Sequence, residues 1–127
     1  ANGDITSVAT ATAALSASLA DGVMIGRGAQ GQPWLLSEVA SYVEGRGQIS
    51  RPRGAAFCEM VSGHYEAMLG FYGVDLGLRA ARKHLGWYMT VAGTGAVLRR
   101  SILTAPSPTK VLTLLPHAFE TGSEAAA

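Results

Sequence analysis

Two glycine-containing motifs near the start of the sequence have residue types that suit the binding of a phosphate group. They are Asn2-Gly3-Asp4 and Gly26-Arg27-Gly28. Glycine lets backbone amides approach phosphate oxygens closely, and an arginine adds a charge-assisted hydrogen bond. Gly3 and Gly26 stand 23 residues apart, which is enough for a loop, a helix and a strand. Two ordinary glycine turns would contain the same residues, so each motif is weak evidence by itself.

A second set of candidate residues is basic. Arg79, Arg82 and Lys83 stand at positions i, i+3 and i+4, so on a helix they share one side. The opposite side of that helix carries apolar residues at helical spacing, namely Leu78, Ala81, Leu85 and Tyr88. The pattern predicts an amphipathic helix that packs with its apolar side and exposes its cations.

The charge around these cations is unevenly distributed. The whole chain has a net charge of +1, yet residues 76–119 contain six Lys or Arg and no Asp or Glu. His84 and His117 add titratable positive potential to this span, and Arg99 and Arg100 begin a second basic cluster. A basic field without acids favours a polyanionic partner, although a solvated helix face would have the same composition. Trp87 could stack on a base or fill the core, as could Tyr88, and the core is the favoured role for both.

The two glycine motifs need a helix and a strand between them to position them. A helix is predicted over residues 8–19, with the hydroxyl of Thr6 or Ser7 as its N-cap. The apolar run at 22–26 predicts a strand buried on both faces, as in a parallel barrel. A second helix is predicted over residues 33–44, where Pro33 suits the first turn.

The remainder of the sequence predicts helices only. Residues 45–54 have the composition of a linker. Further helices are predicted over residues 55–72, 75–91 and 96–104, with a last one from about residue 109. Pro116 lies inside this last helix, where it is expected to cause a kink or an early end.

Composition excludes several kinds of protein. With 48% hydrophobic and 15% charged residues, the chain is expected to fold. Its one cysteine, Cys58, excludes an internal disulfide and fits the cytoplasm; Cys58 is predicted to be a buried apolar residue rather than a nucleophile. His64 has no second ligand at metal spacing, so no metal is expected. No apolar run is long enough to span a bilayer, so no membrane partner is expected.

Three segments in order carry a resemblance to a known family. They read ANGDI at 1–5, GVMIGRGAQGQPW at 22–34 and GLRAARKHLGWY at 77–88. Together they resemble the C-terminal third of bacterial tRNA-dihydrouridine synthases, with the B-type branch the most similar. That family reduces uridines in the D-arm of tRNA with FMN, and NADPH then reduces the oxidised FMN again.

The resemblance implies a fold and a set of site residues. Residues 1–46 would be the last β/α units of an FMN-binding TIM barrel, and residues 50–127 a helical tRNA-binding domain, so the fragment itself would be mostly α. The FMN phosphate would be held by Asn2, Gly3, Asp4, Gly26 and Arg27. The tRNA would be gripped by Arg79, Arg82, Lys83 and His84.

The same resemblance limits what the chain can do alone. The catalytic cysteine of the family lies upstream of the matching segments, and Cys58 does not correspond to it. No catalytic residue is therefore assigned, the isolated chain is expected to be inactive, and the parent enzyme is expected to be a monomer. Two alternatives remain: a fragment of another FMN barrel oxidoreductase, such as a dihydroorotate-dehydrogenase-like enzyme, or a stand-alone helical nucleic-acid-binding or regulatory module.

Overall fold

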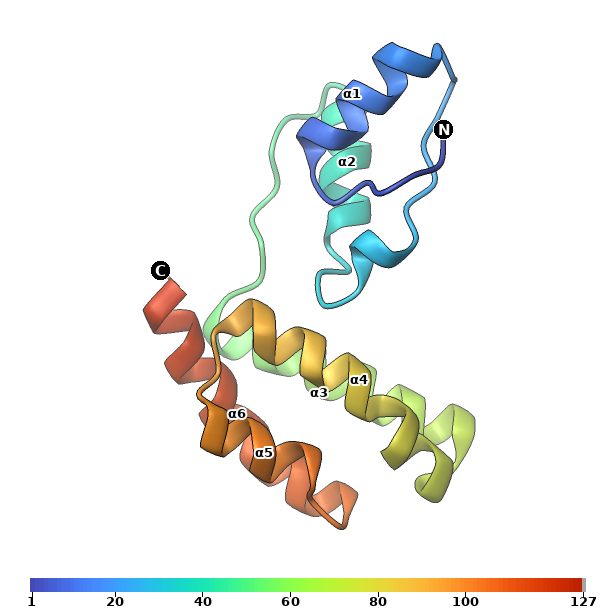
Figure 1. The fold of residues 1–127 in the computed structure, drawn as a ribbon. Helices are drawn as coiled ribbons and strands as arrows, with labels where there is room; N and C mark the ends of the chain where they lie inside the picture. Colours follow the sequence, from blue (N-terminus) through green and yellow to red (C-terminus); the bar gives the residue numbers. More distant parts are fainter. Residues whose placement is uncertain (127) are drawn as a thin grey trace. The chain divides into compact units, whose positions relative to one another are not determined.

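A computed structural model describes the backbone of residues 1–126 and the side chains of residues 1–119 (Figure 1). Within this part of the chain the structure has six α-helices and one short 3-10 helix. It divides into two compact units, Ala1–Arg51 and the residues from Pro52 onward. The chain is thus mostly α-helical, as predicted.

The first unit contains two α-helices joined by irregular backbone. Helix α1 (Val8–Ser18) begins at Ser7, whose hydroxyl accepts from the Thr10 amide while the Thr10 hydroxyl accepts from the Ser7 amide. This reciprocal capping box satisfies donors that the first turn of a helix leaves open. Between α1 and α2 (Leu35–Val43) lies the 3-10 helix η1 (Arg27–Ala29). The prediction of two helices in this region is confirmed.

The predicted strand at residues 22–26 is not formed. Only Met24 pairs, in a single parallel bridge to Asn2, and Met24 is 56% exposed rather than buried. A strand is stabilised by hydrogen bonds to neighbouring strands, and the described residues supply one short neighbouring segment. Val23 and Ile25 do pack against the small core of this unit, which consists of Ile5, Ala11, Leu35 and Val39.

The second unit is a bundle of four helices, with α3 and α4 side by side (Figure 1). Gly73, at φ 84°, separates α3 (Gly54–Tyr72) from α4 (Val74–Ala92). Gly93 ends α4 in the left-handed conformation that glycine adopts without strain. The remaining helices are α5 (Ala96–Leu103) and α6 (Pro108–Ala126).

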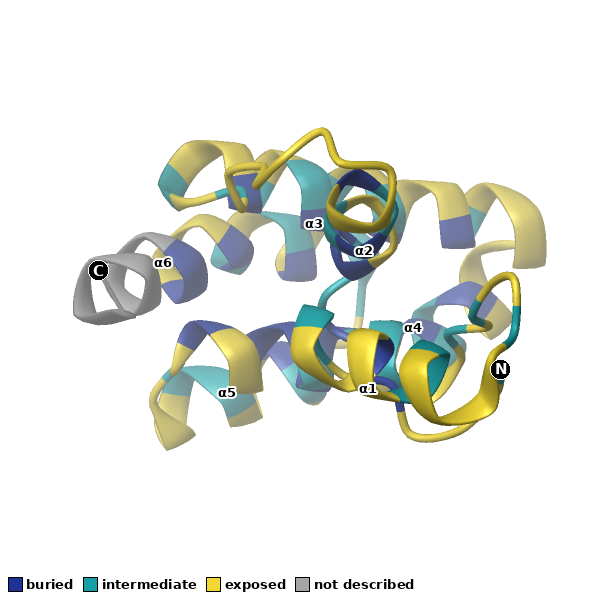
Figure 2. Ribbon diagram, turned by 90° about the horizontal axis from the view of Figure 1, so that it is seen from above, coloured by how far each residue is buried: buried dark blue, intermediate teal, exposed yellow. Residues whose placement is uncertain are grey.

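The core of this bundle forms where α3, α4 and α6 meet, and α5 packs mainly on α6. Figure 2 shows buried positions alternating with exposed ones along the helices. The ring of Phe57 from α3 contacts Phe119 of α6 and Tyr88 of α4 edge-on, with centroids 4.9 and 6.0 Å apart. On the apolar side predicted for the basic helix, Ala81, Leu85 and Tyr88 are buried, and Leu78 is half-buried.

Helix α6 does not end at Pro116, contrary to one of the two predicted outcomes. Proline lacks an amide proton and crowds the carbonyl one turn earlier, so it disfavours a helix interior. Here the helix continues on both sides of Pro116, and its inward residues Val111, Leu115, Ala118 and Phe119 are buried. Packing of this apolar face against α3 and α4 therefore outweighs the local cost of the proline.

Candidate functional site

The two glycine motifs of the first unit meet around one shallow cavity. The bridge between Asn2 and Met24 brings the two segments together. The cavity has a volume of about 420 Å³ and is lined by Asn2, Gly3, Asp4, Met24, Gly26 and Arg27. All five residues predicted to hold a cofactor phosphate thus line the same cavity.

An ion pair spans this cavity. Arg27 Nη2 donates to Asp4 Oδ1 at 2.9 Å, and the two side chains are 83% and 81% exposed. A guanidinium has five N–H donors, so this bond leaves donors for an anion. Among the residues that the structure describes, none accepts from the amides of Gly26 and Arg27. The arrangement suits a phosphate bound to Arg27 and these amides, with Asp4 orienting the guanidinium.

Two contacts that the sequence did not reveal hold the motifs together. A Cβ at Gly28 would lie 1.8 Å from the carbonyl oxygen of Ile5, so only glycine fits where the two segments cross. Gln32 Nε2 donates to the carbonyl oxygens of Gly28, at 2.8 Å, and Thr6, at 3.3 Å. Gly28 was visible as part of the second motif, but nothing in the sequence singled out Gln32.

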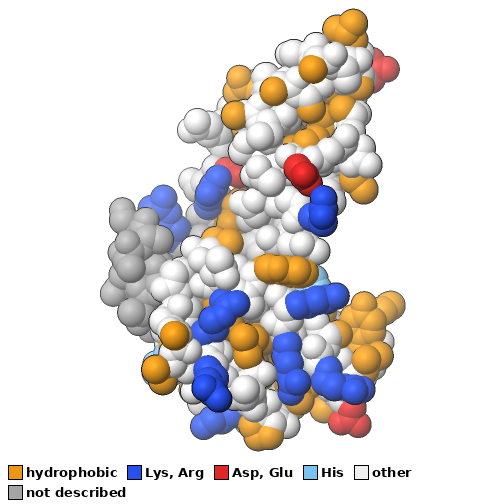
Figure 3. Space-filling view, viewed as in Figure 1, with side chains coloured by type: hydrophobic (Ala, Val, Ile, Leu, Met, Phe, Trp, Pro, Cys, Tyr) orange, Lys and Arg blue, Asp and Glu red, His pale blue; other side chains and the backbone are white. Residues whose placement is uncertain are grey.

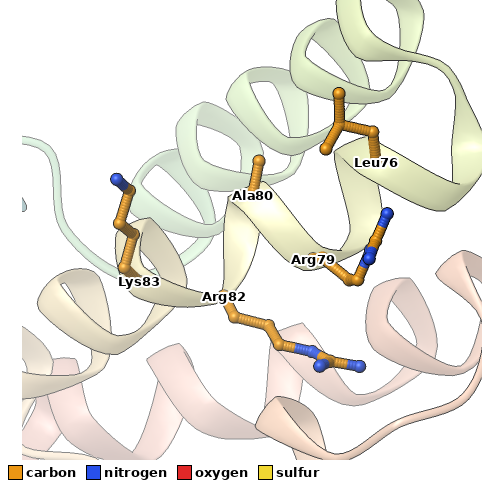
Figure 4. Close-up of a pocket in the computed structure, with 5 residues that line it drawn as sticks. All are labelled: Leu76, Arg79, Ala80, Arg82 and Lys83. Atoms are coloured by element: carbon orange, nitrogen blue, oxygen red, sulfur yellow. The ribbon is translucent and has the colours of Figure 1, made fainter.

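The basic residues of the second unit lie on the exposed side of α4. Arg79, Arg82 and Lys83 are all exposed, and Figure 3 shows Lys and Arg side chains gathered on this face of the helical bundle. They line a groove of about 480 Å³ together with Leu76 and Ala80. In Figure 4 the two guanidinium groups extend to the same side, and Lys83 extends away from them.

These cations are not neutralised within the described side chains. The three ion pairs recorded for residues 1–119 all lie in the first unit. Arg79 Nε makes one long hydrogen bond, 3.4 Å, to the carbonyl oxygen of Asp75. Burial raises the pKa of Tyr65, and the nearby Arg82 cation opposes that shift. Arg82 thus lies near the buried Tyr65 while its own side chain is exposed to solvent.

His84 has surroundings different from those of the other three predicted RNA-binding residues. It is half-buried, and its ring centroid lies 5.3 Å from His64 and 5.1 Å from Trp87. Burial lowers the pKa of His84, and His64 and Lys83 lower it further. Burial also lowers the pKa of His64, whose Nδ1 lies 2.8 Å from the Tyr88 hydroxyl oxygen. These shifts favour the neutral form of both rings, and His84 lies partly buried beside the exposed cations.

A second groove lies between α4 and α5. Its volume is about 420 Å³, and its lining residues are Arg82, Lys83, Gly86, Trp87, Arg99 and Leu103. The core role predicted for Tyr88 is confirmed by its burial, whereas Trp87 is only half-buried and lines the groove. The sequence shows Arg99 only as part of a basic cluster, because its contact with α4 is visible only in the fold.

Two other kinds of site are absent from the described residues. No three His, Cys, Asp or Glu side chains are grouped there so that they could hold a metal ion. Of the helices described, none combines the length and the apolarity needed to cross a membrane.

Comparison with known proteins gives consistent matches along the chain. A sequence model of the family described as "Dihydrouridine synthase (Dus)" matches residues 1–123. The chain is 52% identical over 119 residues to a "Probable tRNA-dihydrouridine synthase" of Rhodobacter capsulatus. It is 43% identical over 111 residues to a protein of the same description from Rickettsia conorii. It is 42% identical over 121 residues to "tRNA-dihydrouridine synthase B" of Xanthomonas axonopodis.

The matches cover this chain more fully than they cover the relatives. They include 94%, 87% and 94% of this chain, but 36%, 34% and 36% of the three relatives. The chain therefore spans about a third of the length of the curated relatives it matches.

Proposed function

The chain belongs to the dihydrouridine synthase family, and we propose that it is the part of a tRNA-dihydrouridine synthase that anchors the cofactor phosphate and holds the tRNA. The observation that carries this proposal is the basic surface of α4, in a chain whose family match extends over both units. The full enzyme would reduce uridine to dihydrouridine in the D-arm of tRNA, with NADPH as its reductant.

The first unit fits the end of a parallel barrel. Residues near Asn2 and Met24 run in parallel with helix α1 between them, which is the order of a β-α-β crossover. The loops after the last strands of such barrels commonly form a phosphate site. The cavity between Asp4 and Arg27 lies where these loops would be.

The donors present fit the phosphate end of FMN. Arg27 would bind the phosphate through its guanidinium. The backbone amides of Gly26 and Arg27, which have no acceptor among the described residues, would donate further hydrogen bonds to it. The Asp4 carboxylate would repel a phosphate at close range, so its role is to orient Arg27 through the 2.9 Å ion pair. When bound, FMN supplies the hydride chemistry of the reaction.

The second unit would hold the tRNA. Arg79, Arg82 and Lys83 are exposed on one helix side, and within the described side chains no carboxylate pairs with them. Such a surface binds phosphates without reading sequence, so it would position the tRNA rather than select the uridine. His84 would support this surface by packing between His64 and Trp87.

The proton donor of the reaction would come from outside this chain. Cys58 lies half-buried on α3, and its Sγ is 3.9 Å from the hydroxyl oxygen of Ser62, which is not a base. A catalytic thiol needs surroundings that favour its thiolate, or a position from which it can donate its proton to the substrate. The isolated chain should therefore bind RNA without reducing it.

A chimera tests this function directly. This chain would replace the matching 119 residues of the Rhodobacter capsulatus relative, and dihydrouridine in tRNA would be measured by mass spectrometry after incubation with NADPH. We expect activity from the chimera and none from the chain alone. A chimera that retains flavin but neither binds nor modifies tRNA would instead indicate a different flavin-dependent oxidoreductase.

A further inference from the structure

The groove between α4 and α5 has features that phosphate binding alone does not require. Lys83 and Trp87 stand one helical turn apart on α4, and Arg99 faces them from α5. Gly86 forms the floor between them, since a Cβ there would lie 3.2 Å from Arg99 Nη2. The groove thus combines a half-buried indole with three cationic side chains.

Arg99 is held in place rather than free in solvent. Its Nη1 donates to the carbonyl oxygen of Gly86 at 2.9 Å and to the Thr90 hydroxyl oxygen at 3.1 Å. No carboxylate among the described side chains pairs with it. A guanidinium fixed by one nitrogen keeps its other donors for an anion and loses less conformational entropy on binding.

The two grooves of α4 share two of their lining residues. Arg82 and Lys83 line both the groove that contains Arg79 and the groove that contains Trp87. A phosphate backbone that crosses α4 at Arg79 can therefore continue over Arg82 and Lys83 to Arg99. Proteins that bind single-stranded RNA combine such a cationic track with aromatic side chains on which bases stack.

We propose that the groove lined by Arg82, Lys83, Gly86, Trp87 and Arg99 is a subsite for one unpaired nucleotide of the RNA. Trp87 stacks on its base, and Arg99 and Lys83 bind the phosphates on either side. This subsite rests on the proposed function and refines it: the α4 surface holds the backbone, and the groove holds a nucleotide that has left the base stack.

Fluorescence gives the sharpest test, because the chain has only two tryptophans. In a Trp34→Phe background, Trp87 is the only fluorophore of its kind. We expect tRNA and a single-stranded RNA oligonucleotide to quench it with saturation. An abasic oligonucleotide of equal length and charge should bind without quenching. Equal quenching by the abasic chain or by heparin would overturn the subsite, because neither can stack a base.

Matched variants separate stacking from folding. Trp87→Leu should weaken tRNA binding roughly 5- to 100-fold, whereas Trp87→Tyr, which keeps an aromatic face, should retain most of the affinity. Arg99→Gln should also weaken binding, and Arg100→Gln, which removes the same charge from an exposed neighbour outside the groove, should do so much less. Equal affinity for Trp87→Leu and the parent would refute the subsite alone. A chain with no tRNA affinity would refute the proposed function as well.

Discussion

Arg99 of α5 binds Gly86 of α4: its Nη1 donates a 2.9 Å hydrogen bond to the Gly86 carbonyl oxygen. A methyl group at position 86 would lie 3.2 Å from Nη2, so the guanidinium would have to move by a few tenths of an ångström. The end of an arginine side chain can make that movement easily. The glycine therefore matters for the position of the guanidinium more than for the helix.

Gly86→Ala should separate stability from RNA binding. Alanine gains up to about 1 kcal/mol of helix propensity over glycine, and displacement of Arg99 offsets part of that gain. We expect a free energy of unfolding within about 1 kcal/mol of the parent and a several-fold loss of tRNA affinity. Urea unfolding and filter binding measure the two quantities. A loss of affinity that simply follows a loss of stability would contradict this account.

Gly77 and Gly70 should respond in opposite directions to alanine, although both lie inside helices. At Gly77 a Cβ would lie 2.9 Å from the Leu69 Cα and 3.1 Å from the Met68 carbonyl oxygen, so α3 and α4 would have to separate. We expect Gly77→Ala to destabilise the second unit by about 1–3 kcal/mol. A Cβ built at Gly70 has no neighbouring side chain or other element within 4 Å. Gly70→Ala should therefore stabilise the second unit by about 0.5–1 kcal/mol. Urea unfolding followed by circular dichroism gives both values.

Gly28→Ala should force apart the segments around Ile5 and Gly28, which cross in the first unit. A Cβ at this position would lie 1.8 Å from the Ile5 carbonyl oxygen, which is a backbone atom and cannot move alone. Gly3→Ala is the matched control, because nothing lies within 4 Å of its Cβ position. Limited proteolysis should cut residues 1–51 faster in Gly28→Ala and at the parental rate in Gly3→Ala. Equal protection of both variants would show that the crossing is not important for the unit.

Burial of His64 and His84 predicts a stability that falls in mild acid. Both have a folded-state pKa below the unfolded value of about 6.5. The unfolded chain therefore binds more protons in this range, so the free energy of unfolding rises with pH. The contribution of the two neutral histidines to the free energy of unfolding is complete above about pH 6.5. It is lost as the pH falls through their folded-state pKa values. The two rings contact each other, His64 also contacts Tyr88, and His84 also contacts Trp87. The positive charge of Lys83 acts on His84 as well.

Urea midpoints measured between pH 5 and pH 8 test this prediction. The parent should lose stability below about pH 6.5, and the double variant His64→Gln with His84→Gln should lose less over the same range. An identical pH slope in parent and variant would assign the acid sensitivity to other groups.

The helices could be predicted from sequence because glycines and capping hydroxyls mark their ends. Ser7, Gly73 and Gly93 stand where α1, α3 and α4 begin or end. Contacts between distant residues could not be predicted this way. The hydrogen bonds from Arg99 to Gly86 and from Gln32 to Thr6 join residues that are far apart in the sequence. For Pro116 the local rule was sound, but tertiary packing outweighed it.

The five residues of the phosphate site could be predicted because each motif is a short contiguous run. The structure brings both runs to one cavity. The basic helix likewise follows from spacing alone, since positions i, i+3 and i+4 share a side. For His84 the sequence shows only its place next to the cations, and the rings of His64 and Trp87 near it are visible only in the fold.

The salt dependence of tRNA binding tests the role of the α4 cations. Each phosphate contact releases counterions, so its loss should flatten the plot of log affinity against log salt by about one unit. The double variant Arg79→Gln with Lys83→Gln should therefore bind more weakly and show a slope smaller by up to about two units. The control Arg46→Gln with Arg51→Gln removes the same net charge, but from arginines that are ion-paired in the first unit.

The comparison of the two double variants distinguishes local contact from overall charge. If both lower the affinity and flatten the slope equally, net charge alone explains RNA binding, and the α4 side is an ordinary solvated face. If only the α4 pair does so, the phosphates lie on that helix. We expect the second result, because Arg79 and Lys83 are exposed along a groove without carboxylate partners among the described side chains, whereas Arg46 and Arg51 already have Glu44 and Glu38 beside them.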